Sequence, residues 1–428
     1  METTMKLLVL SCHYHIANLS TREKVAFATP SLVQAAYERW TQVHPDTEIV
    51  LLSTCNRVEL YVAAEDDAAV TGDQLVSFLA TFHHLPKDFV HASTVLREGT
   101  NVAKHLFRVT CSLDSIAIGE TQIVAQAKAA YNTAIEADSC GPVLHALFQR
   151  ALAVSAKVRT KTRLSKGRVS IASVAIGSSV KTVFSQLSHR TAVVIGAGEM
   201  AAETLHHLRA NGIGRVVVLN RSPDKAAVLA KKFGAETAGL DDINDWLGHT
   251  DVVVTATSST DVLIDRTRLD LARTANTAQP LVLVDLAAPR NIDCDTASCS
   301  GVSLFNLDDL GSSSQIDSAS RSEDLAAATE IVEEGAKQFQ KLLYHRKSAG
   351  VIRTLKNQID EIATRELQSL FRKSARFDAT QVAEIEDAVT RVVNKMLHSP
   401  FSKIKQAAAD GVPSKLLNSL EVLFELPT

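Results

Sequence analysis

Residues 51–61 read LLSTCNRVELY, and this stretch indicates both a fold element and a chemistry. Residues 51–52 end an apolar run typical of a buried strand, and the alternation over residues 58–62 predicts a second strand. The polar tip between them contains Cys55 and, two residues later, Arg57. The thiolate is the nucleophilic form of cysteine, and a nearby cation favours it, so Cys55 is a candidate nucleophile. The alternative is a small buried cysteine that only packs.

Composition and length set the class of protein. The chain has 428 residues, 46% hydrophobic and 22% charged, which is enough for two or three domains with their own cores. No apolar run is long enough to span a bilayer, and the N-terminus reads as a first strand rather than a signal peptide. The six cysteines show no C-x-x-C spacing, so no zinc site or other metal site is indicated and a reducing, cytoplasmic compartment is expected. The net charge of −3 leaves nucleic-acid binding to local basic patches.

Residues 1–165 form the first expected domain. Strands interleave with helices through short connections, which predicts an α+β sandwich. Thr21 is a candidate helix cap in the segment HIANLSTREKVAF. Strands are expected over residues 5–11 and 90–96 and helices over residues 31–41, 72–84 and 142–164.

The motif S-T-C-N-R-x-E-x-Y over residues 53–61 resembles the active-site signature of the glutamyl-tRNA reductases, which are NADPH-dependent enzymes of tetrapyrrole biosynthesis. Residues 103–131, AKHLFRVTCSLDSIAIGETQIVAQAKAAY, are similar to the block H-L-F-x-V…G-L-D-S…G-E-x-Q-I-x-x-Q-x-K of that family. Ser112 departs from the usual glycine and Thr121 from the usual proline. The resemblance extends from about residue 5 to about residue 405.

The resemblance implies a set of site residues. His105 is expected near Cys55, although a lone histidine beside an apolar helix face is more often structural. Glu120 is expected to pair with the α-ammonium of a glutamyl group, and Arg57 to hold its γ-carboxylate in a fork. The expected glutamyl pocket consists of Thr54, Asn56, Arg57, Ser115, Glu120, Thr121, Gln122 and Gln126.

The end of the expected helix at residues 142–164 is strongly basic. Two readings stay open: a solvated helix end that the helix dipole favours, or a phosphate-binding stripe. The basic residues are Lys157, Arg159, Lys161, Arg163, Lys166 and Arg168.

Residues 166–310 predict a Rossmann-type, doubly wound dinucleotide domain. A strand over residues 191–195 runs into G-x-G-x-x-A and then a helix, a pattern that cradles a pyrophosphate. The next strand, 215–219, ends in Asn-Arg-Ser instead of an acid, which suits a 2′-phosphate and therefore NADPH. The expected cofactor-binding residues are Gly196, Ala197, Gly198, Glu199, Met200, Ala201, Asn220, Arg221 and Ser222, with Thr257, Ser258, Asp285 and Pro289 as further candidates at strand ends.

Residues 311–428 predict helices without catalytic residues. A Ser-rich linker is expected over residues 311–320, followed by a long helix with a coiled-coil-like apolar seam over residues 325–342 that Gly350 interrupts. Two more amphipathic helices follow, and Pro400 is expected to end the second. Such narrow stripes require a partner, and the family places a long helix and a dimerisation domain here, so a homodimer is expected.

Taken together, the resemblance implies a multidomain α/β enzyme that reduces glutamyl-tRNA(Glu) to glutamate-1-semialdehyde with NADPH. Cys55 forms a thioester, which NADPH reduces. A glutamate-1-semialdehyde aminomutase is implied as a partner by the family alone. Two alternatives stay open: an NADPH-dependent acyl-phosphate or semialdehyde reductase with a catalytic cysteine, and a non-catalytic NADPH-binding redox regulator.

Overall fold

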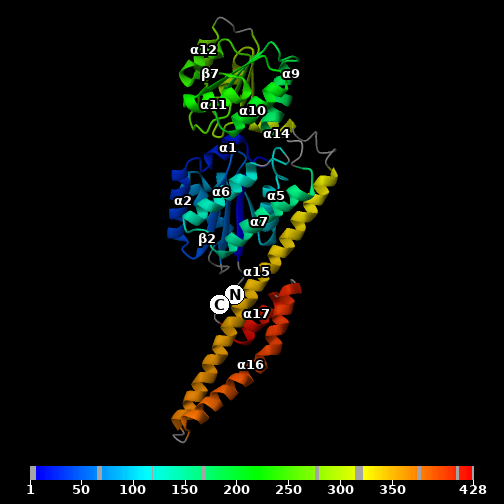
Figure 1. Cartoon of the computed structure of the whole chain (residues 1–428). Coiled ribbons are helices and arrows are strands. Elements are labelled where there is room, and N and C mark those ends of the chain that lie inside the picture. Colours follow the sequence, from blue (N-terminus) through cyan, green and yellow to red (C-terminus); the bar gives the residue numbers. More distant parts are fainter. Residues whose placement is uncertain are drawn as a thin grey trace.

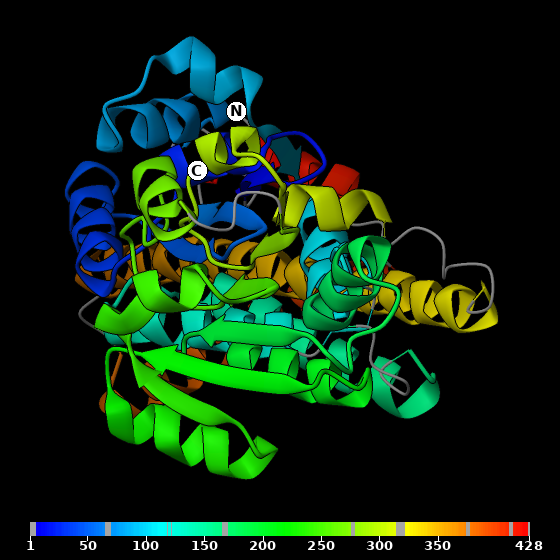
Figure 2. The same cartoon turned by 90° about the horizontal axis from the view of Figure 1, so that it is seen from above.

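The computed structural model describes residues 6–64, 70–117, 119–120, 122–164, 170–274, 279–313, 322–373, 377–410 and 414–426. Figure 1 shows three parts: an N-terminal domain, a nucleotide domain above it, and a long helix that leads away to a helical C-terminal part. Seen from above, the nucleotide domain lies over the N-terminal domain, with the long helix crossing beneath (Figure 2). None of the described helices has the length and apolar character that crossing a bilayer requires.

The N-terminal domain is built on an antiparallel sheet in the order β2-β3-β1-β4. The hairpin between β2 (Thr47–Ser53) and β3 (Arg57–Ala64) has residues 54–56 at its tip, as the sequence predicts. Both strands are buried almost throughout, because helices cover the sheet. The other elements are β1 (Lys6–His13), β4 (Val95–Glu98), α1 (Leu19–Lys24), α2 (Pro30–Val43), α3 (Gly72–Phe82), α4 (Lys87–Ala92), α5 (Thr100–Thr110), α6 (Gln122–Glu136) and α7 (Pro142–Lys161).

Two local predictions in this domain are wrong. The expected strand over residues 90–96 is the end of α4 followed by β4, because the apolar run there is split between a helix face and a strand. Thr21 does not cap α1. Asn18 does so, since its side-chain oxygen accepts a hydrogen bond from the Thr21 amide at 2.9 Å.

The nucleotide domain contains a parallel six-stranded sheet in the order β10-β9-β8-β5-β6-β7. This is a doubly wound sheet, as the sequence predicts, with helices on both faces and an apolar cluster under each. The strands are β5 (Thr191–Ile195), β6 (Arg215–Asn220), β7 (Glu236–Gly239), β8 (Val252–Thr255), β9 (Leu281–Asp285) and β10 (Val302–Asn306). The helices are α8 (Ile171–Val174), η1 (Ala175–Val180), α9 (Lys181–Val183), α10 (Glu199–Ala210), α11 (Pro223–Phe233), η2 (Leu240–Asp242), α12 (Ile243–Leu247), α13 (Arg266–Ala272), η3 (Cys294–Ser298) and α14 (Leu307–Ser313).

The C-terminal part consists of α15 (Ser322–Lys373), α16 (Ala379–Asp410) and α17 (Ser414–Leu423). Two predictions fail here, because α15 continues through Gly350 and α16 continues through Pro400. A single glycine costs a helix only about 1 kcal/mol, which a helix of this length tolerates. Beyond Pro400, Ile404 is buried in an apolar cluster with α15 and α17, which holds the rest of α16 in place. The expected linker at residues 311–320 lies mostly outside the described residues, and residues 311–313 belong to α14.

The first half of α15 packs on its own chain. Its buried residues Ala328, Val332, Ala336 and Phe339 belong to the core cluster of the N-terminal domain. Gly335 allows this close approach, because a Cβ at its position would lie 2.6 Å from a methyl carbon of Val154. The apolar seam over residues 325–342 is therefore an intrachain packing surface and not the contact with a partner that the pattern suggested.

Candidate active site

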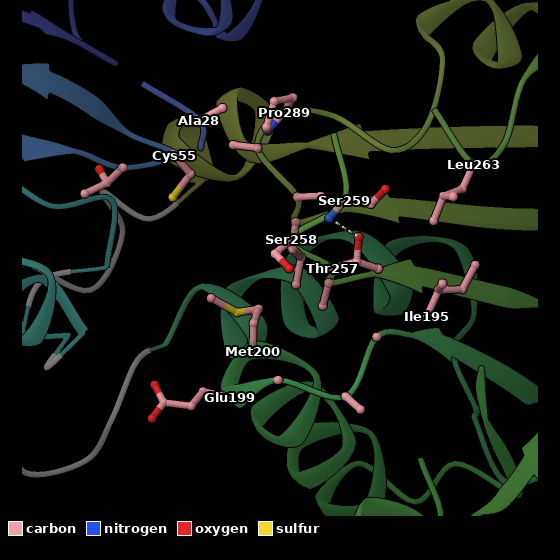
Figure 3. Close-up of a pocket in the computed structure, with 18 of the residues that line it drawn as sticks. Ala28, Cys55, Ile195, Glu199, Met200, Thr257, Ser258, Ser259, Leu263 and Pro289 are labelled. Carbon is pink, nitrogen blue, oxygen red and sulfur yellow. Dashed lines mark hydrogen bonds between the residues drawn. The ribbon is translucent and has the colours of Figure 1, made fainter. Parts of the chain in front are cut away.

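A cavity of about 930 Å³ lies between the N-terminal domain and the nucleotide domain. Figure 3 shows its lining: Cys55 and Ala28 come from the N-terminal side, whereas Glu199, Met200 and residues 257–259 come from the nucleotide domain. The cavity is large enough for a dinucleotide and part of a second reactant. It brings the candidate nucleophile and the glycine motif to one space, although they are far apart in the sequence.

The hairpin tip positions Cys55. The Thr54 amide donates to the Arg57 carbonyl at 2.8 Å, and the Thr54 hydroxyl accepts from the amides of Asn56 and Arg57 at 3.3 Å each. These bonds close a tight loop across the strand ends, which leaves the Cys55 side chain at the cavity wall (Figure 3).

The electrostatics of Cys55 differ from the sequence-based expectation. Burial raises the pKa of its thiol to about 11, and the negative charge of Glu120 adds to the rise. The guanidiniums of Arg22 and Arg57 lower this pKa by less than burial raises it. Cys55 is only partly buried and borders the cavity, so its sulfur is open to solvation from that side, which favours the thiolate.

A buried carboxylate, Glu59, organises the residues behind Cys55. It accepts hydrogen bonds from Ser11 (2.9 Å), Arg57 (2.9 Å), His105 (2.7 Å) and Tyr61 (2.5 Å). These donors and the nearby positive charges outweigh burial and hold the pKa of Glu59 well below its usual value. Since Glu59 is therefore ionised, Nε2 of His105 must carry the proton that it shares with Oε1.

Of the residues expected in the glutamyl pocket, Thr54, Gln122 and Gln126 line the cavity. Arg57 faces inward: it is 2% exposed, pairs with Glu59 and donates to the Asp114 carbonyl. Its guanidinium is committed to the protein, in contrast to the expected fork to a substrate. Within the described part of the chain, three further residues of that expected pocket do not border the cavity, namely Asn56, Ser115 and Glu120, and His105 does not border it either. Thr121 lies outside the described residues.

Glu120 occupies an unusual environment near Cys55. Burial and the negative charge of Glu203 on α10 raise the pKa of Glu120 to about 7. Among the described residues, none donates a hydrogen bond to its Oε1. The carbonyl of Glu120 accepts a hydrogen bond from Ser112, which adopts a left-handed φ of 57°. That conformation explains why a glycine suits position 112. In this chain the hydrogen bond of the Ser112 hydroxyl offsets part of the cost of a left-handed backbone at a non-glycine residue.

The glycine motif occupies the turn from β5 into α10. Gly196 has φ 120°, and a Cβ there would lie 2.3 Å from the Ala256 carbonyl oxygen, so no other residue fits. A Cβ at Gly198 would meet open space, which leaves the backbone accessible from the cavity. The first amides of α10 therefore provide donors for a phosphate, while buried Ala201 packs beneath them. A dinucleotide fits this part of the cavity.

The end of β6 adds positive charge to the same wall. Asn220, Arg221 and Ser222 all line the cavity, and Arg221 is exposed to it. Lys225, in the first turn of α11, also lines it and was missed by the sequence analysis. Its signal was present, because Lys225 lies in the first turn of the helix that directly follows the Asn-Arg-Ser strand end. Two cations at this strand end suit a 2′-phosphate.

The other strand-end candidates divide into two groups. Thr257, Ser258 and Pro289 line the cavity as expected. Asp285 does not line it. Its carboxylate accepts from the amides of Ala287, Asn291 and Ile292 and from the Thr255 hydroxyl, so it organises the loop instead.

His13 and Arg22 were also missed. His13, at the end of β1, lies with its ring centroid 6.5 Å from that of His105, and burial lowers its pKa to about 4. Arg22 is buried and donates to the Cys55 carbonyl at 3.1 Å. The segment HIANLSTREKVAF held no local signal for the burial of Arg22, because its partners Cys55 and Asp308 lie 33 and 286 residues away.

Comparison with known proteins identifies the parts of the chain. The family model "Glutamyl-tRNAGlu reductase, N-terminal domain" matches residues 10–162, and the model "Glutamyl-tRNAGlu reductase, dimerisation domain" matches residues 327–426. Between them, the model "Shikimate / quinate 5-dehydrogenase" matches residues 178–313, which identifies a dehydrogenase-type nucleotide domain.

Full-length relatives agree with these matches. The glutamyl-tRNA reductase of Rhodopirellula baltica is 36% identical over 423 residues, covering 99% of this chain and 99% of that protein. The glutamyl-tRNA reductase of Pseudomonas fluorescens is 34% identical over 95% of each chain. The solved glutamyl-tRNA reductase of Methanopyrus kandleri has 26% identity and a TM-score of 0.52, covering 97% of this chain and 100% of that one. With its cysteine hairpin, dinucleotide domain and dimerisation-type helices in the same order, the chain belongs to the glutamyl-tRNA reductase family.

Proposed function

We propose that this chain reduces glutamyl-tRNA(Glu) to glutamate-1-semialdehyde with NADPH, the first step of tetrapyrrole biosynthesis, and that it acts as a homodimer. The single observation that carries the mechanism is the shared cavity, because Cys55 and the glycine motif border the same space. A nucleophilic cysteine that faces a dinucleotide site suits acyl capture followed by reduction.

In the first step, the Cys55 thiolate attacks the ester carbonyl carbon of glutamyl-tRNA. A C–S bond forms, the C–O bond to the terminal ribose breaks, and the tRNA oxygen takes up a proton. Covalent capture keeps the acyl group at the cavity wall and divides one difficult reaction into two easier ones. NADPH, when bound, supplies the hydride that converts the thioester to the aldehyde and returns Cys55 as a thiolate.

The protein's residues have distinct tasks in this scheme. Gln122 and Gln126 line the cavity from α6 and provide amide groups for the polar ends of the glutamyl group. Arg57 and His105 act from behind the hairpin, because both bind Glu59 and hold the loop that carries Cys55. The amides at the start of α10 hold the pyrophosphate, and Arg221 with Lys225 holds the 2′-phosphate.

The test follows the glutamyl group. Without NADPH, glutamyl-tRNA labelled in its glutamyl part should leave a label on the protein that neutral hydroxylamine removes, as a thioester requires. With NADPH, the label should leave as semialdehyde. Cys55→Ser should abolish both results, because a serine hydroxyl has no comparably accessible anion.

Cys299→Ser is the matched control, because Cys299 is likewise partly buried but lies in the nucleotide domain. It should retain both results. Reduction of glutamyl-tRNA by the Cys55→Ser protein at a comparable rate would disprove the mechanism. Oxidation of NADPH with glutamyl phosphate but not with glutamyl-tRNA would assign an acyl-phosphate substrate instead.

A further inference from the structure

Helix α1 lies between the two domains that form the cavity (Figure 1). Its Arg22 side chain, 2% exposed, binds three groups at once. It donates to the Ala17 carbonyl at 2.7 Å, to the Cys55 carbonyl at 3.1 Å and to the Asp308 carboxylate of α14 at 2.9 Å. One guanidinium therefore connects the peptide of the candidate nucleophile to the nucleotide domain.

Neighbouring residues of α1 strengthen this junction. The Leu19 amide donates to the other oxygen of Asp308 at 2.6 Å, and the Leu19 side chain is buried in an apolar cluster of the nucleotide domain. The Glu23 carboxylate receives a two-pronged set of bonds from Arg290 at 2.7–3.1 Å, which includes the Arg290 backbone amide. We call Leu19, Arg22 and Glu23 with Asp308 and Arg290 the α1 latch.

The α1 latch differs from ordinary surface ion pairs, which contribute little. Arg22 is buried, and Glu23, Arg290 and Asp308 are only 18–31% exposed. The bonds are charge-assisted, and the bonds from Arg290 to Glu23 have fork geometry. If the nucleotide domain moved away, Arg22 would lose its carboxylate and would remain as a buried charge, which is strongly unfavourable. Arg22 would then have to move toward water, and the Cys55 carbonyl would lose its donor.

We propose that the α1 latch is a positioning device that holds the nucleotide domain against the Cys55 loop for reduction of the thioester, and that formation of the thioester does not require it. This inference rests on the function proposed above. Acyl capture involves Cys55 and the tRNA ester, so the N-terminal domain suffices for it. Reduction involves both domains, and a transfer between bound groups demands reacting atoms within about 3–3.5 Å of each other.

Three single variants and one double variant test the α1 latch. Asp308→Ala removes the acceptor of Arg22 and of Leu19, whereas Glu23→Arg and Arg290→Glu each place two like charges together. Each single variant should lower semialdehyde formation by at least about tenfold, which corresponds to about 1.4 kcal/mol. Without NADPH, the rate at which the hydroxylamine-sensitive label forms should differ from the wild-type rate by less than about twofold.

The double variant Glu23→Arg/Arg290→Glu restores an opposite-charge pair with reversed polarity. It should recover a large part of the semialdehyde formation that each single change removes. The control Glu236→Gln removes an exposed ion pair with Arg215 inside the nucleotide domain. It should leave both semialdehyde formation and label formation unchanged.

A second readout does not depend on turnover. In the protein without cofactor, the Leu19 amide is bonded to Asp308, so its hydrogen exchange reports the closed junction. Exchange in the peptide containing residues 19–24 should accelerate in Asp308→Ala and in the two charge-reversal single variants, and slow again in the double variant.

The proposal fails if Asp308→Ala reduces the acyl group at the wild-type rate. It also fails if label formation falls in parallel with reduction, since the α1 latch would then be needed for folding or for acyl capture. A double variant no better than the single ones would contradict it as well. By contrast, a wild-type protein that takes up no label would overturn the proposed function itself, so the two failures can be distinguished.

Discussion

At the scale of residues, Cys55 shows how environment overrides a sequence pattern. Two guanidiniums stabilise its thiolate, yet burial and the Glu120 charge keep the pKa near 11. Burial thus opposes the ionisation that attack on an acyl group requires, and the cavity beside the sulfur decides how far it does so. Since entry of water or substrate changes the solvation of the sulfur, the reactivity of Cys55 depends on what fills the cavity.

Replacing Glu120 by Gln should lower the pKa of Cys55, because it removes a negative charge that disfavours the thiolate. The rate of alkylation by iodoacetamide should therefore reach half its maximum at lower pH than in the wild type, measured by mass spectrometry on the peptide that contains Cys55. Glu236→Gln, at a distant exposed pair, should not move the profile. An unchanged profile in Glu120→Gln would show that the Glu120 charge does not contribute to this pKa.

Arg221→Ala should raise the KM for NADPH far more than the KM for NADH. Arg221 lines the cavity at the end of β6, and losing a charge-assisted bond to a phosphate costs about 1.5–3 kcal/mol, or roughly ten- to a hundred-fold. Steady-state kinetics with both cofactors measure the ratio. Lys225→Ala should act in the same direction, and equal effects on the two cofactors would refute the 2′-phosphate assignment.

The sequence predicted the positions of some of these residues in the fold. Cys55 and the glycine motif were predictable because the motif and the flanking periodicity specify a loop tip and a strand–helix turn. The inward orientation of Arg57 was not predictable. Strand alternation places Glu59 on the same face as Arg57, but it does not say that this face is buried, and Asp114 comes from a loop 57 residues away.

At the scale of elements, α15 shows why the apolar seam over residues 325–342 was wrongly interpreted as a contact with a partner chain. An apolar stripe indicates that a helix face will be buried, but it does not indicate whether the same chain or a partner chain buries it. Here α5 and α7 of the same chain cover it. Strands with strict alternation of apolar and polar residues were predictable. Gly350 and Pro400 were wrongly taken as helix ends, because packing stabilises a long helix by more than one helix-breaking residue destabilises it.

Gly335→Val should destabilise the N-terminal domain by about 1–3 kcal/mol, because the new side chain must displace Val154 and Phe107. Urea unfolding monitored by Trp40 fluorescence, in a Trp246→Phe background, would measure the change. Gly350→Ala is the control, because a Cβ there meets open space, and it should stabilise the helix by about 0.5–1 kcal/mol. Equal effects at both positions would contradict the packing role of Gly335.

At the scale of the whole molecule, α16 exposes apolar side chains that the single chain leaves uncovered. Val392 and Met396 lie one turn apart and are 56% and 72% exposed. If this face is the homodimer contact, Val392→Asp/Met396→Asp should produce a monomer in sedimentation velocity at micromolar concentration. Leu271→Asp, at a site of similar exposure on the nucleotide domain, should leave the dimer intact. A double variant that sediments as a dimer would place the contact elsewhere.

The arrangement of domains was beyond the reach of sequence patterns. Each domain was recognisable by its own periodicity and motifs, but the contacts that join them connect residues 267 to 289 positions apart. Arg22, Glu23, Arg290 and Asp308 are ordinary charged residues in their local sequence. Only the folded chain shows that they face one another. The Cys55 hairpin and the dinucleotide site could therefore each be predicted, but not that they border one cavity.

The bonds of Arg22 to Cys55 and Asp308 imply a thermodynamic linkage between the two halves of the molecule. Whatever stabilises the docked nucleotide domain also restrains the Cys55 peptide, and the coupling free energy is the same in both directions. If Cys55 is acylated as proposed, acylation should change the affinity for dinucleotide by the same factor by which dinucleotide changes the equilibrium for acylation. A six-residue helix thus provides a physical connection through which the two sites can influence each other's equilibria.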